Sequence, residues 1–368
     1  MKNFLIIFLL FSVFLFSDDH DMHKDHESMH KNHESMDMME HKDHTGHHSS
    51  APIGTTGNMH HMGWMVSVKQ GLMDMNGNIL NGDSVSNAEI LQMPNPLGSM
   101  PANLSVIPED MDMHMTMIDV MYAPSPDLTL MMMGTYVSKD MGLSTYIPMM
   151  DRSLLGKFST SSSDLSELTF SVLRKLQEQD DSKWHGEVTL QKSIGTNDDT
   201  GQVLTPMGTE MNMTLPYAMQ ASDKATRLVL GLTNTRKLSD KTSWTNQVRY
   251  KKVIDEQDWA FGDQAELNSW VQYQHKPHLS FSTRLKFISQ DAISGANPMI
   301  MAPVQTANPI NYGGDELHIG LGVNHDLSFL TSKQDVLGIE ILFPVIQDKN
   351  NLQMETSYQL VVGFKRSF

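Results

Sequence analysis

Beyond residue 61 the chain consists largely of segments of about ten residues in which apolar and polar residues alternate. A period of two places the apolar side chains on one face of a β-strand and the polar side chains on the other. In the segment 279–289, leucine or phenylalanine occupies positions 279, 281, 285 and 287, and serine, arginine or lysine occupies positions 280, 282, 284 and 286. Twelve such segments can be counted, at residues 64–73, 112–122, 128–138, 167–177, 184–194, 226–236, 244–253, 266–274, 279–289, 315–325, 336–343 and 355–368. The pattern predicts an all-β chain.

The connections between these segments alternate in length. Short turns follow the second, fourth, sixth, eighth and tenth segments, and long loops follow the first, third, fifth and ninth. This arrangement, with an even number of strands, is typical of an outer-membrane barrel whose two termini lie in the periplasm. Only closure removes the unpaired edge that a sheet would expose to lipid. We therefore expect an antiparallel transmembrane β-barrel of the outer-membrane type with about twelve strands. The alternative, a soluble β-sandwich of similar strand count, does not explain the one-sided loop lengths.

The last segment ends on an aromatic residue. Phe368 is in register with the apolar face, as in barrels whose C-terminus is read by the barrel-assembly machinery, so this machinery and outer-membrane lipid are the expected partners. Arg366 interrupts the same face. Trp184 and Trp244 begin segments just after short turns, and Tyr122 ends one just before a turn. These three rings are candidates for an aromatic girdle at the periplasmic interface.

Composition excludes several classes of protein. The chain has 368 residues and no cysteine, which excludes a disulfide framework and a zinc site built on thiolates. Its formal net charge of -16 argues against nucleic acid as a partner, because phosphate binding needs clustered Lys and Arg. No apolar run of about 20 residues occurs after the N-terminus, so the chain is not a helical membrane protein.

Residues 1–17 read MKNFLIIFLLFSVFLFS, a positive residue followed by an apolar run that ends in a small residue. This is the pattern of a secretory signal peptide, and the mature chain is expected to begin at Asp18. A retained signal anchor is the alternative, because Leu15 is a poor residue for a cleavage site.

Residues 18–61 form a tail rich in His, Met, Asp, Glu and Lys that buries too little apolar surface to fold alone. We expect it to be disordered, to lie in the periplasm and to end in a flexible linker at residues 49–58. Imidazole binds Cu, Zn and Ni, and thioether binds Cu(I), so the tail is a candidate metal-binding segment. Its candidate ligands are His20, His23, His26, His30, His33, His41, His44, His47 and His48. The alternative is a solvated acidic tail whose histidines have no function.

In the first three barrel segments the face that should be polar carries methionine. Met113, Met115 and Met117 share one parity with Asp119, and soft sulfur selects Cu(I) and Ag(I) over hard cations. These three methionines are therefore candidate metal ligands. Two alternatives remain: methionine is a flexible apolar filler, or the two faces of this strand are reversed.

The polar faces of the segments predict a mixed, wet lumen. The candidate pore-lining residues are Asp119, Met131, Met133, His185, Glu187, Arg249, Lys251, Arg284, Lys286 and His318. No GxSxG, HExxH or P-loop motif occurs, so we expect no enzyme, although a hydrolase at the lumen or rim remains an alternative. We expect no obligatory cofactor, and the candidate ligand is copper or another transition metal.

Several strings resemble signature segments of a poorly characterised Gram-negative family of outer-membrane transporter-like β-barrels. They are MYAPSPDLTLMMMG from Met121, VLTPMG from Val203, LPYAMQ from Leu215, IMAPVQTANP from Ile300 and YGG from Tyr312. More loosely, the chain is similar to the phenol-degradation (MetA-type) barrels. The resemblance extends from about Met62 to the end. It implies an outer-membrane location, a transport role and a pore shaped by inward-folded extracellular loops, and it implies no catalytic residues.

These observations predict three parts: a signal peptide at 1–17, a disordered His/Met-rich periplasmic tail and linker at 18–61, and an outer-membrane β-barrel at 62–368. The expected function is an outer-membrane pore or transporter that handles soft transition-metal ions, copper above all. The alternatives are a passive channel for small organic molecules and a barrel that only anchors a metal-sequestering tail.

Overall fold

The computed structural model describes residues 51–57, 62–98, 100–149, 152–328 and 335–368. The signal sequence and the nine candidate histidines of the tail lie outside these residues, so their expected roles stay predictions. No helix in the described part of the chain is both long enough and apolar enough to cross a membrane.

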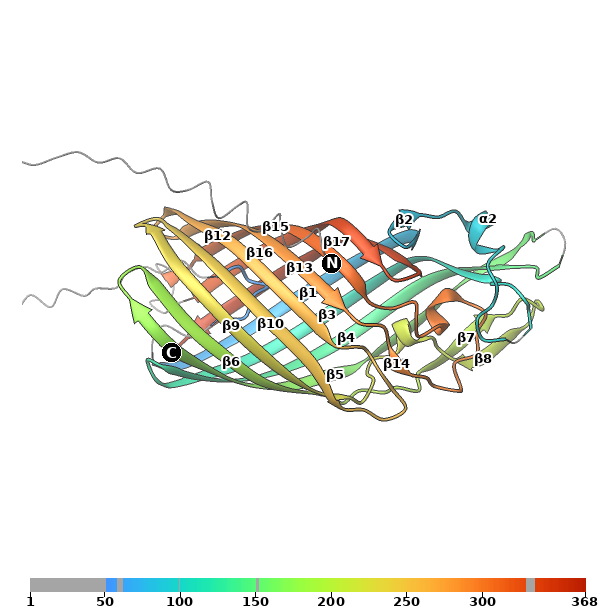
Figure 1. The fold of residues 1–368 in the computed structure, drawn as a ribbon, viewed down its shortest axis with the longest axis horizontal. Coiled ribbons are helices and arrows are strands. Elements are labelled where there is room, and N and C mark those ends of the chain that lie inside the picture. The colour runs from blue at the N-terminus through green and yellow to red at the C-terminus, as the bar shows by residue number, and fades with distance from the viewer. Residues whose placement is uncertain (1–50, 58–61, 99, 150–151, 329–334) are drawn as a thin grey trace, which may run out of the picture. The chain divides into compact units, whose positions relative to one another are not determined.

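Twelve antiparallel strands close into one β-barrel, as the alternating segments predict (Figure 1). Each strand pairs with the next along the chain, and the last pairs with the first, with Val68 opposite Phe364 and Leu72 opposite Leu360. The barrel strands are β1 (Gly63–Leu80), β3 (Val106–Ser125), β4 (Leu128–Tyr146), β5 (Leu154–Gln179), β6 (Ser182–Ser193), β9 (Thr226–Ser239), β10 (Thr242–Asp255), β12 (Gln264–Lys276), β13 (Leu279–Gln290), β15 (Gly314–Asp326), β16 (Asp335–Lys349) and β17 (Leu352–Ser367). Because one closed sheet makes the whole wall, the β-sandwich alternative is excluded.

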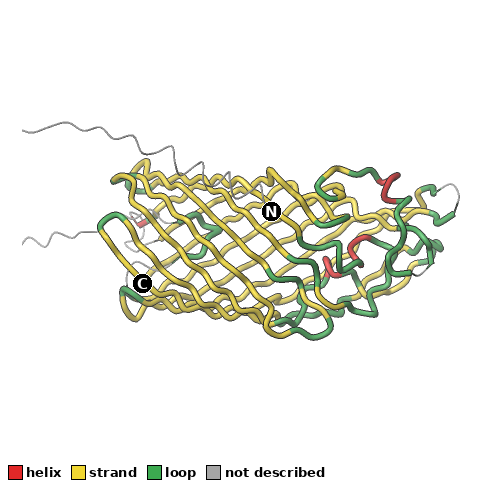
Figure 2. The backbone as a smooth tube through the Cα atoms, viewed as in Figure 1, coloured by secondary structure: helices red, strands yellow, loops and turns green. Residues whose placement is uncertain are grey.

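The remaining elements are short and lie in the long connections, which gather at one end of the barrel (Figure 2). They are β2 (Asp83–Ser84), α2 (Asn87–Ile90), β7 (Thr200–Leu204), β8 (Glu210–Thr214), η1 (Tyr217–Met219), β11 (Trp259–Ala260), β14 (Ser294–Gly295) and η2 (Gln305–Ala307). At the other end two-residue turns join β3 to β4, β5 to β6, β9 to β10 and β12 to β13. There the Phe368 N–H donates to the Trp64 carbonyl oxygen at 2.8 Å, which ties the C-terminus to the first strand.

The outer face of the barrel is apolar. Ile118, Phe170 and Val248 are each more than half exposed, at 53%, 52% and 54%. Exposed apolar area on this scale is unfavourable in water and is stabilised by the hydrocarbon of a bilayer. The barrel is therefore of the membrane-spanning type.

Two aromatic rings lie on the outer face at the tight-turn end. Trp64 on β1 stacks on Tyr122 on β3, with ring centroids 4.5 Å apart. The interruption of the apolar face at Arg366 has a local explanation, because its guanidinium donates two hydrogen bonds of 2.7 Å to the carboxylate of buried Asp335 on the neighbouring strand. Pairing lowers the cost of a charge at this face.

Candidate functional site

One wall of the lumen is lined with methionine. Along β3 the odd-numbered residues point inward, because Met111 and Asp119 are buried whereas Ile118 and His114 are exposed on the outside. Met113, Met115 and Met117 share the inward parity and are half-buried. The methyl ends of Met115 and Met117 lie over Gly71 of β1, where an added Cβ would be 3.2 and 3.6 Å from them. The two faces of this strand are thus not reversed.

The strand register brings methionines of neighbouring strands directly opposite one another. Met73 of β1 faces Met113 of β3, and Met121 of β3 lies between Met65 of β1 and Met131 of β4. Residues directly opposite in an antiparallel pair have Cβ atoms about 4.5–5.5 Å apart, so their thioethers are within reach of each other. Spacing within one strand did not reveal this pairing, because it depends on which strands are neighbours.

The two ends of the methionine wall belong to apolar clusters. Met121 and Met131 pack with Ala123 and Leu173 near the tight turns, and Met111 packs in a larger cluster near the long loops. At these ends the methionine side chains pack against other apolar side chains. The central positions of the wall are the ones that the lumen can reach.

The opposite wall is charged. The Arg249 guanidinium donates two hydrogen bonds, of 3.1 and 2.9 Å, to the two carboxylate oxygens of Glu187. Arg284 Nε lies 3.0 Å from Glu340 Oε1, and both side chains are buried. Paired charges of both signs make this wall polar without a strong net field.

The structure places the predicted pore-lining residues around the whole circumference and does not gather them into one centre. Their strands and parities set Asp119, Met131, Met133, His185, Glu187, Arg249, Lys251, Arg284, Lys286 and His318 on the lumenal face. His318 is fully buried, and its Nε2 lies 3.3 Å from Glu316 Oε2. Trp270 is also buried on the lumenal side. No three His, Asp or Glu side chains in the described part of the chain are arranged to hold a metal ion.

The segment 51–57, expected to be part of a flexible linker, contacts the inner wall of the barrel. The Gly54 N–H donates to Glu340 Oε2 at 3.1 Å, and Gln247 Nε2 on β10 donates to the Thr56 carbonyl oxygen at 3.0 Å. Ile53 is 1% exposed and lies over Gly338 and Gly363 of β16 and β17. The segment therefore links β10 to β16 and β17 inside the barrel and narrows the lumen. Ile53 is the one signal that was overlooked, since a branched apolar residue is unusual in a free linker.

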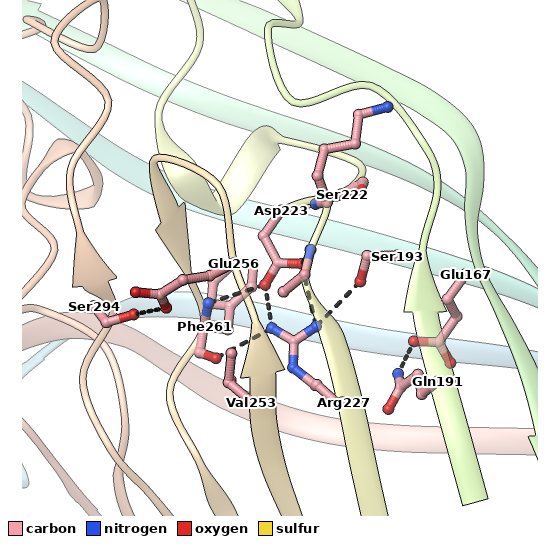
Figure 3. Close-up of polar contacts among 12 residues, drawn as sticks. Glu167, Gln191, Ser193, Ser222, Asp223, Arg227, Val253, Glu256, Phe261 and Ser294 are labelled. Carbon is pink, nitrogen blue, oxygen red and sulfur yellow. Dashed lines mark hydrogen bonds and ion pairs between the residues drawn. The ribbon is translucent and has the colours of Figure 1, made fainter.

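Inward-packed loops narrow the other end of the lumen, and an ion pair holds one of them. The Arg227 guanidinium at the start of β9 donates to both carboxylate oxygens of Asp223, to Ser193 Oγ and to the Phe261 carbonyl oxygen (Figure 3). Burial raises the pKa of Asp223, but hydrogen bonds and the charge of Arg227 outweigh it and hold that pKa below its usual value. Asp223 thus stays ionised and fixes the loop that precedes β9.

Four aromatic rings join three of these loops. Tyr217 contacts Trp259 at 4.8 Å and Tyr312 at 6.1 Å between centroids, and Phe261 contacts both Trp259 at 5.3 Å and Tyr312 at 5.8 Å. Lys139 on β4 supports the same region by donating to the carbonyl oxygens of Ala218 and Gln220 at 2.8 and 2.6 Å. Through these contacts the loops form a packed cap. The resemblance in the sequence implied inward-folded loops of this kind.

An apolar cavity of about 40 Å³ lies between this cap and the wall. Its lining comes from β3, β4, β5 and two loops and includes Met141, Phe158, Leu215 and Val304. Almost all of its surface is carbon or sulfur, so a ligand there would be apolar.

No protein-family model matches the chain, and no curated protein matches its sequence. Among solved structures, an outer-membrane channel from Pseudomonas putida F1 superposes with a TM-score of 0.52 at 14% identity, over 84% of this chain and 96% of that one. The NanC porin has a TM-score of 0.42 at 8% identity, over 82% and 100% of the two chains. A FadL homologue from Pseudomonas aeruginosa has a TM-score of 0.41 at 8% identity, over 83% and 90%.

The likeness to the Pseudomonas putida channel shows the fold, a closed antiparallel barrel like that of this outer-membrane protein, as the resemblance in the sequence implied. Together with the apolar outer face, it defines the class of protein: a twelve-stranded β-barrel of the outer-membrane type with a narrowed lumen.

Proposed function

We propose that this barrel is an outer-membrane channel or transporter that handles a soft transition-metal ion, copper above all, and that its N-terminal tail binds the same ion in the periplasm. The observation that carries the proposal is the half-buried row Met113, Met115 and Met117 on the lumenal face of β3, with Met73 opposite Met113.

A general porin needs a hydrated, polar lumen, which thioethers do not provide. Thioether sulfur is a soft ligand that prefers Cu(I) and Ag(I) over hard cations such as Mg²⁺ and Ca²⁺. A row of such groups offers an ion successive weak contacts, which favours passage over permanent capture. The function proposed is transport, and no enzymatic step is involved.

The test replaces Met113, Met115 and Met117 together by leucine. The substitutions nearly conserve volume, so each should cost less than about 1.5 kcal/mol of stability. Cells that carry this variant should be as sensitive to silver or copper as cells without the gene, and their uptake of a small sugar should be unchanged. The matched control is Met132→Leu, because Met132 is 58% exposed on the outer face of the neighbouring strand β4, opposite Val120 of β3. Unchanged metal sensitivity of the triple variant would show that these methionines are filler.

The tail is tested separately by deleting residues 18–48 and keeping the segment 51–57. A phenotype that follows the tail alone would favour the barrel as an anchor for a metal-sequestering tail. A phenotype that needs both parts supports the proposed channel.

A second candidate is a passive channel for small organic molecules, and the apolar cavity beside Met141 and Phe158 favours it. Narrowing this cavity with Thr160→Leu should then slow the entry of an apolar solute into liposomes and leave metal sensitivity unchanged.

A further inference from the structure

The lumenal methionine wall contains one buried carboxylate with an unused oxygen. Asp119 lies on β3 and is fully buried. Its Oδ1 accepts a hydrogen bond from Ser67 Oγ and lies 3.4 Å from Lys69 Nζ. Its Oδ2 has no hydrogen-bond partner among the residues that the structure describes, and neither does the buried Oγ1 of nearby Thr135. A buried carboxylate oxygen without a partner is costly, so a ligand that it can bind is the natural explanation.

Methionine surrounds this carboxylate. Eight positions on the same face of the sheet adjoin Asp119, two along its own strand, two directly opposite and four diagonal, and five of them are methionine. The five are Met65, Met117, Met121, Met131 and Met133, and the other three are Ser67, Lys69 and Thr135. Side chains at directly opposite and diagonal positions are within reach of one another when they are long.

We propose that Asp119 and the methionines around it bind one soft monovalent cation, Cu(I) or Ag(I). Thioether sulfurs supply the soft ligands, and the free Oδ2 supplies the negative charge that a buried cation needs. Met117 and Met133 are half-buried, so they face the lumen through which an ion would arrive. Met121 and Met131 are buried and lie on the side of the site that is nearer the tight turn between β3 and β4.

The surrounding charges favour a monovalent ion. Lys69 contacts Asp119, and Lys365 lies across the sheet opposite Ser67. Two ammonium groups repel a divalent ion twice as strongly as a monovalent one. Lys69 therefore competes with the bound ion for the carboxylate, and removing it should strengthen binding.

The segment 51–57 approaches the wall beside the proposed site. Ile53 and Lys69 both lie over Gly363, where an added Cβ would be 2.7 Å from Ile53 Cγ1 and 3.0 Å from Lys69 Cγ. The segment that contains Ile53 continues, in sequence, from the His- and Met-rich tail.

The experiment measures Ag(I) binding by the full-length chain in detergent micelles, by equilibrium dialysis with metal analysis. Asp119→Asn keeps the shape of the side chain and removes its charge, so it should lose about one equivalent of Ag(I) or bind it at least about tenfold more weakly. Lys69→Gln breaks the same ion pair but should bind Ag(I) as tightly as the natural chain or more tightly. The tail is present in every variant and contributes equally.

A second readout locates the ion. Coordination occupies a sulfur lone pair, so Ag(I) should protect Met117 and Met133 from oxidation by hydrogen peroxide in the natural chain and in Lys69→Gln, but not in Asp119→Asn. Peptide mass spectrometry reads each methionine separately. If Asp119→Asn does not fold, Met117→Leu with Met133→Leu replaces it and should lower Ag(I) binding, with Met132→Leu as the control.

Unchanged binding and protection in Asp119→Asn would overturn the site. Equal losses in Asp119→Asn and Lys69→Gln would also overturn it, because the ion pair would then be structural. This inference rests on the proposed soft-metal function but fails separately from it. If purified Asp119→Asn binds Ag(I) normally, and the silver sensitivity of cells still depends on the barrel, the proposed site is wrong and the proposed function stands. If Asp119→Asn loses Ag(I) binding, but cells with and without the gene have the same metal sensitivity, the proposed function is wrong and the site stands.

Discussion

The side-chain amide of Gln347 on β16 takes the place of a peptide group opposite Thr356 on β17. Gln347 Nε2 donates to the Thr356 carbonyl oxygen at 3.1 Å, and the Thr356 N–H donates to Gln347 Oε1 at 2.8 Å. The hydrogen-bonded register of these strands ends at the pair Leu342–Gln359, two residues before Pro344, which has no N–H to donate. Gln347 thus satisfies backbone groups that the ladder no longer reaches.

Replacing Gln347 by methionine keeps the length of the side chain and removes both hydrogen bonds. Thr356 is buried, so its two backbone groups would be left unpaired, at a cost of roughly 1–3 kcal/mol each. We expect the midpoint of urea unfolding in liposomes to fall accordingly. Gln70→Met, on the outer face, is the control, and an equal fall in both variants would refute the role given to Gln347.

The loop before β9 should open in acid. The folded-state pKa of Asp223 is lowered, so its ion pair with Arg227 contributes fully to stability above the unfolded value of about 4 and is lost as the pH falls through the lower folded value. Breaking a buried pair costs roughly 3–5 kcal/mol, so protection of residues 215–225 from hydrogen exchange should drop in that range.

Asp223→Asn should show the unprotected state already at pH 7 and little further change on acidification. The control is Asp240→Asn, which breaks the exposed Lys237–Asp240 pair on a tight turn and should leave the loop unaffected. Loss of protection in the natural chain at pH 6 would contradict the prediction, because Asp223 is still ionised there.

The segment 51–57 should limit conductance. A Cβ at Gly338 would lie 2.8 Å from Ile53 Cβ, and one at Gly363 would lie 2.7 Å from Ile53 Cγ1. Both distances are too short, so Gly338→Ala with Gly363→Ala should push Ile53 away from the wall and raise the single-channel conductance in planar bilayers. Gly134→Ala meets only Leu168, at 3.5 Å, and serves as the control. Conductance that does not change in the double variant would show that the segment is not the narrowing element.

The sequence predicts a copper site at the N-terminus of the mature chain. Cleavage after Ser17 leaves Asp18, Asp19 and His20, whose amine, two amides and imidazole can surround Cu(II) with four nitrogens in a plane. A peptide starting at Asp18 should bind one Cu(II) with the corresponding visible band, and binding should weaken below a pH of about 6 as the imidazole protonates. Acetylation of the amine or His20→Ala should abolish the band. A mature protein with a different first residue would rule the site out.

The twelve strands and their two faces were predictable because each strand carries its own alternation. Parity along β3 alone set Met113 and Met117 with Asp119 and set Ile118 on the other face. The same rule applies to Trp270, whose parity with Asn268 and Gln272 sets it on the lumenal side, where it is buried. The alternation of short turns and long loops was sufficient to predict a barrel.

The partners of these side chains were not predictable in the same way. Gly54 and Glu340 are 286 residues apart, and Gln247 and Thr56 are 191 apart. Apart from the branched apolar residue Ile53, nothing in the composition of residues 49–58 indicates that part of this segment is bound to the wall. The role of Gln347 likewise depends on where the ladder between two particular strands ends.

The sequence by itself thus determined the number of strands, the face on which each residue lies and the end at which the loops gather, because these follow from local periodicity and turn length. Only the tertiary structure decided what fills the lumen, which methionines face one another and which carboxylate oxygen stays free. Those features depend on strand register and on closure of β17 onto β1, which bring together residues that no local pattern connects.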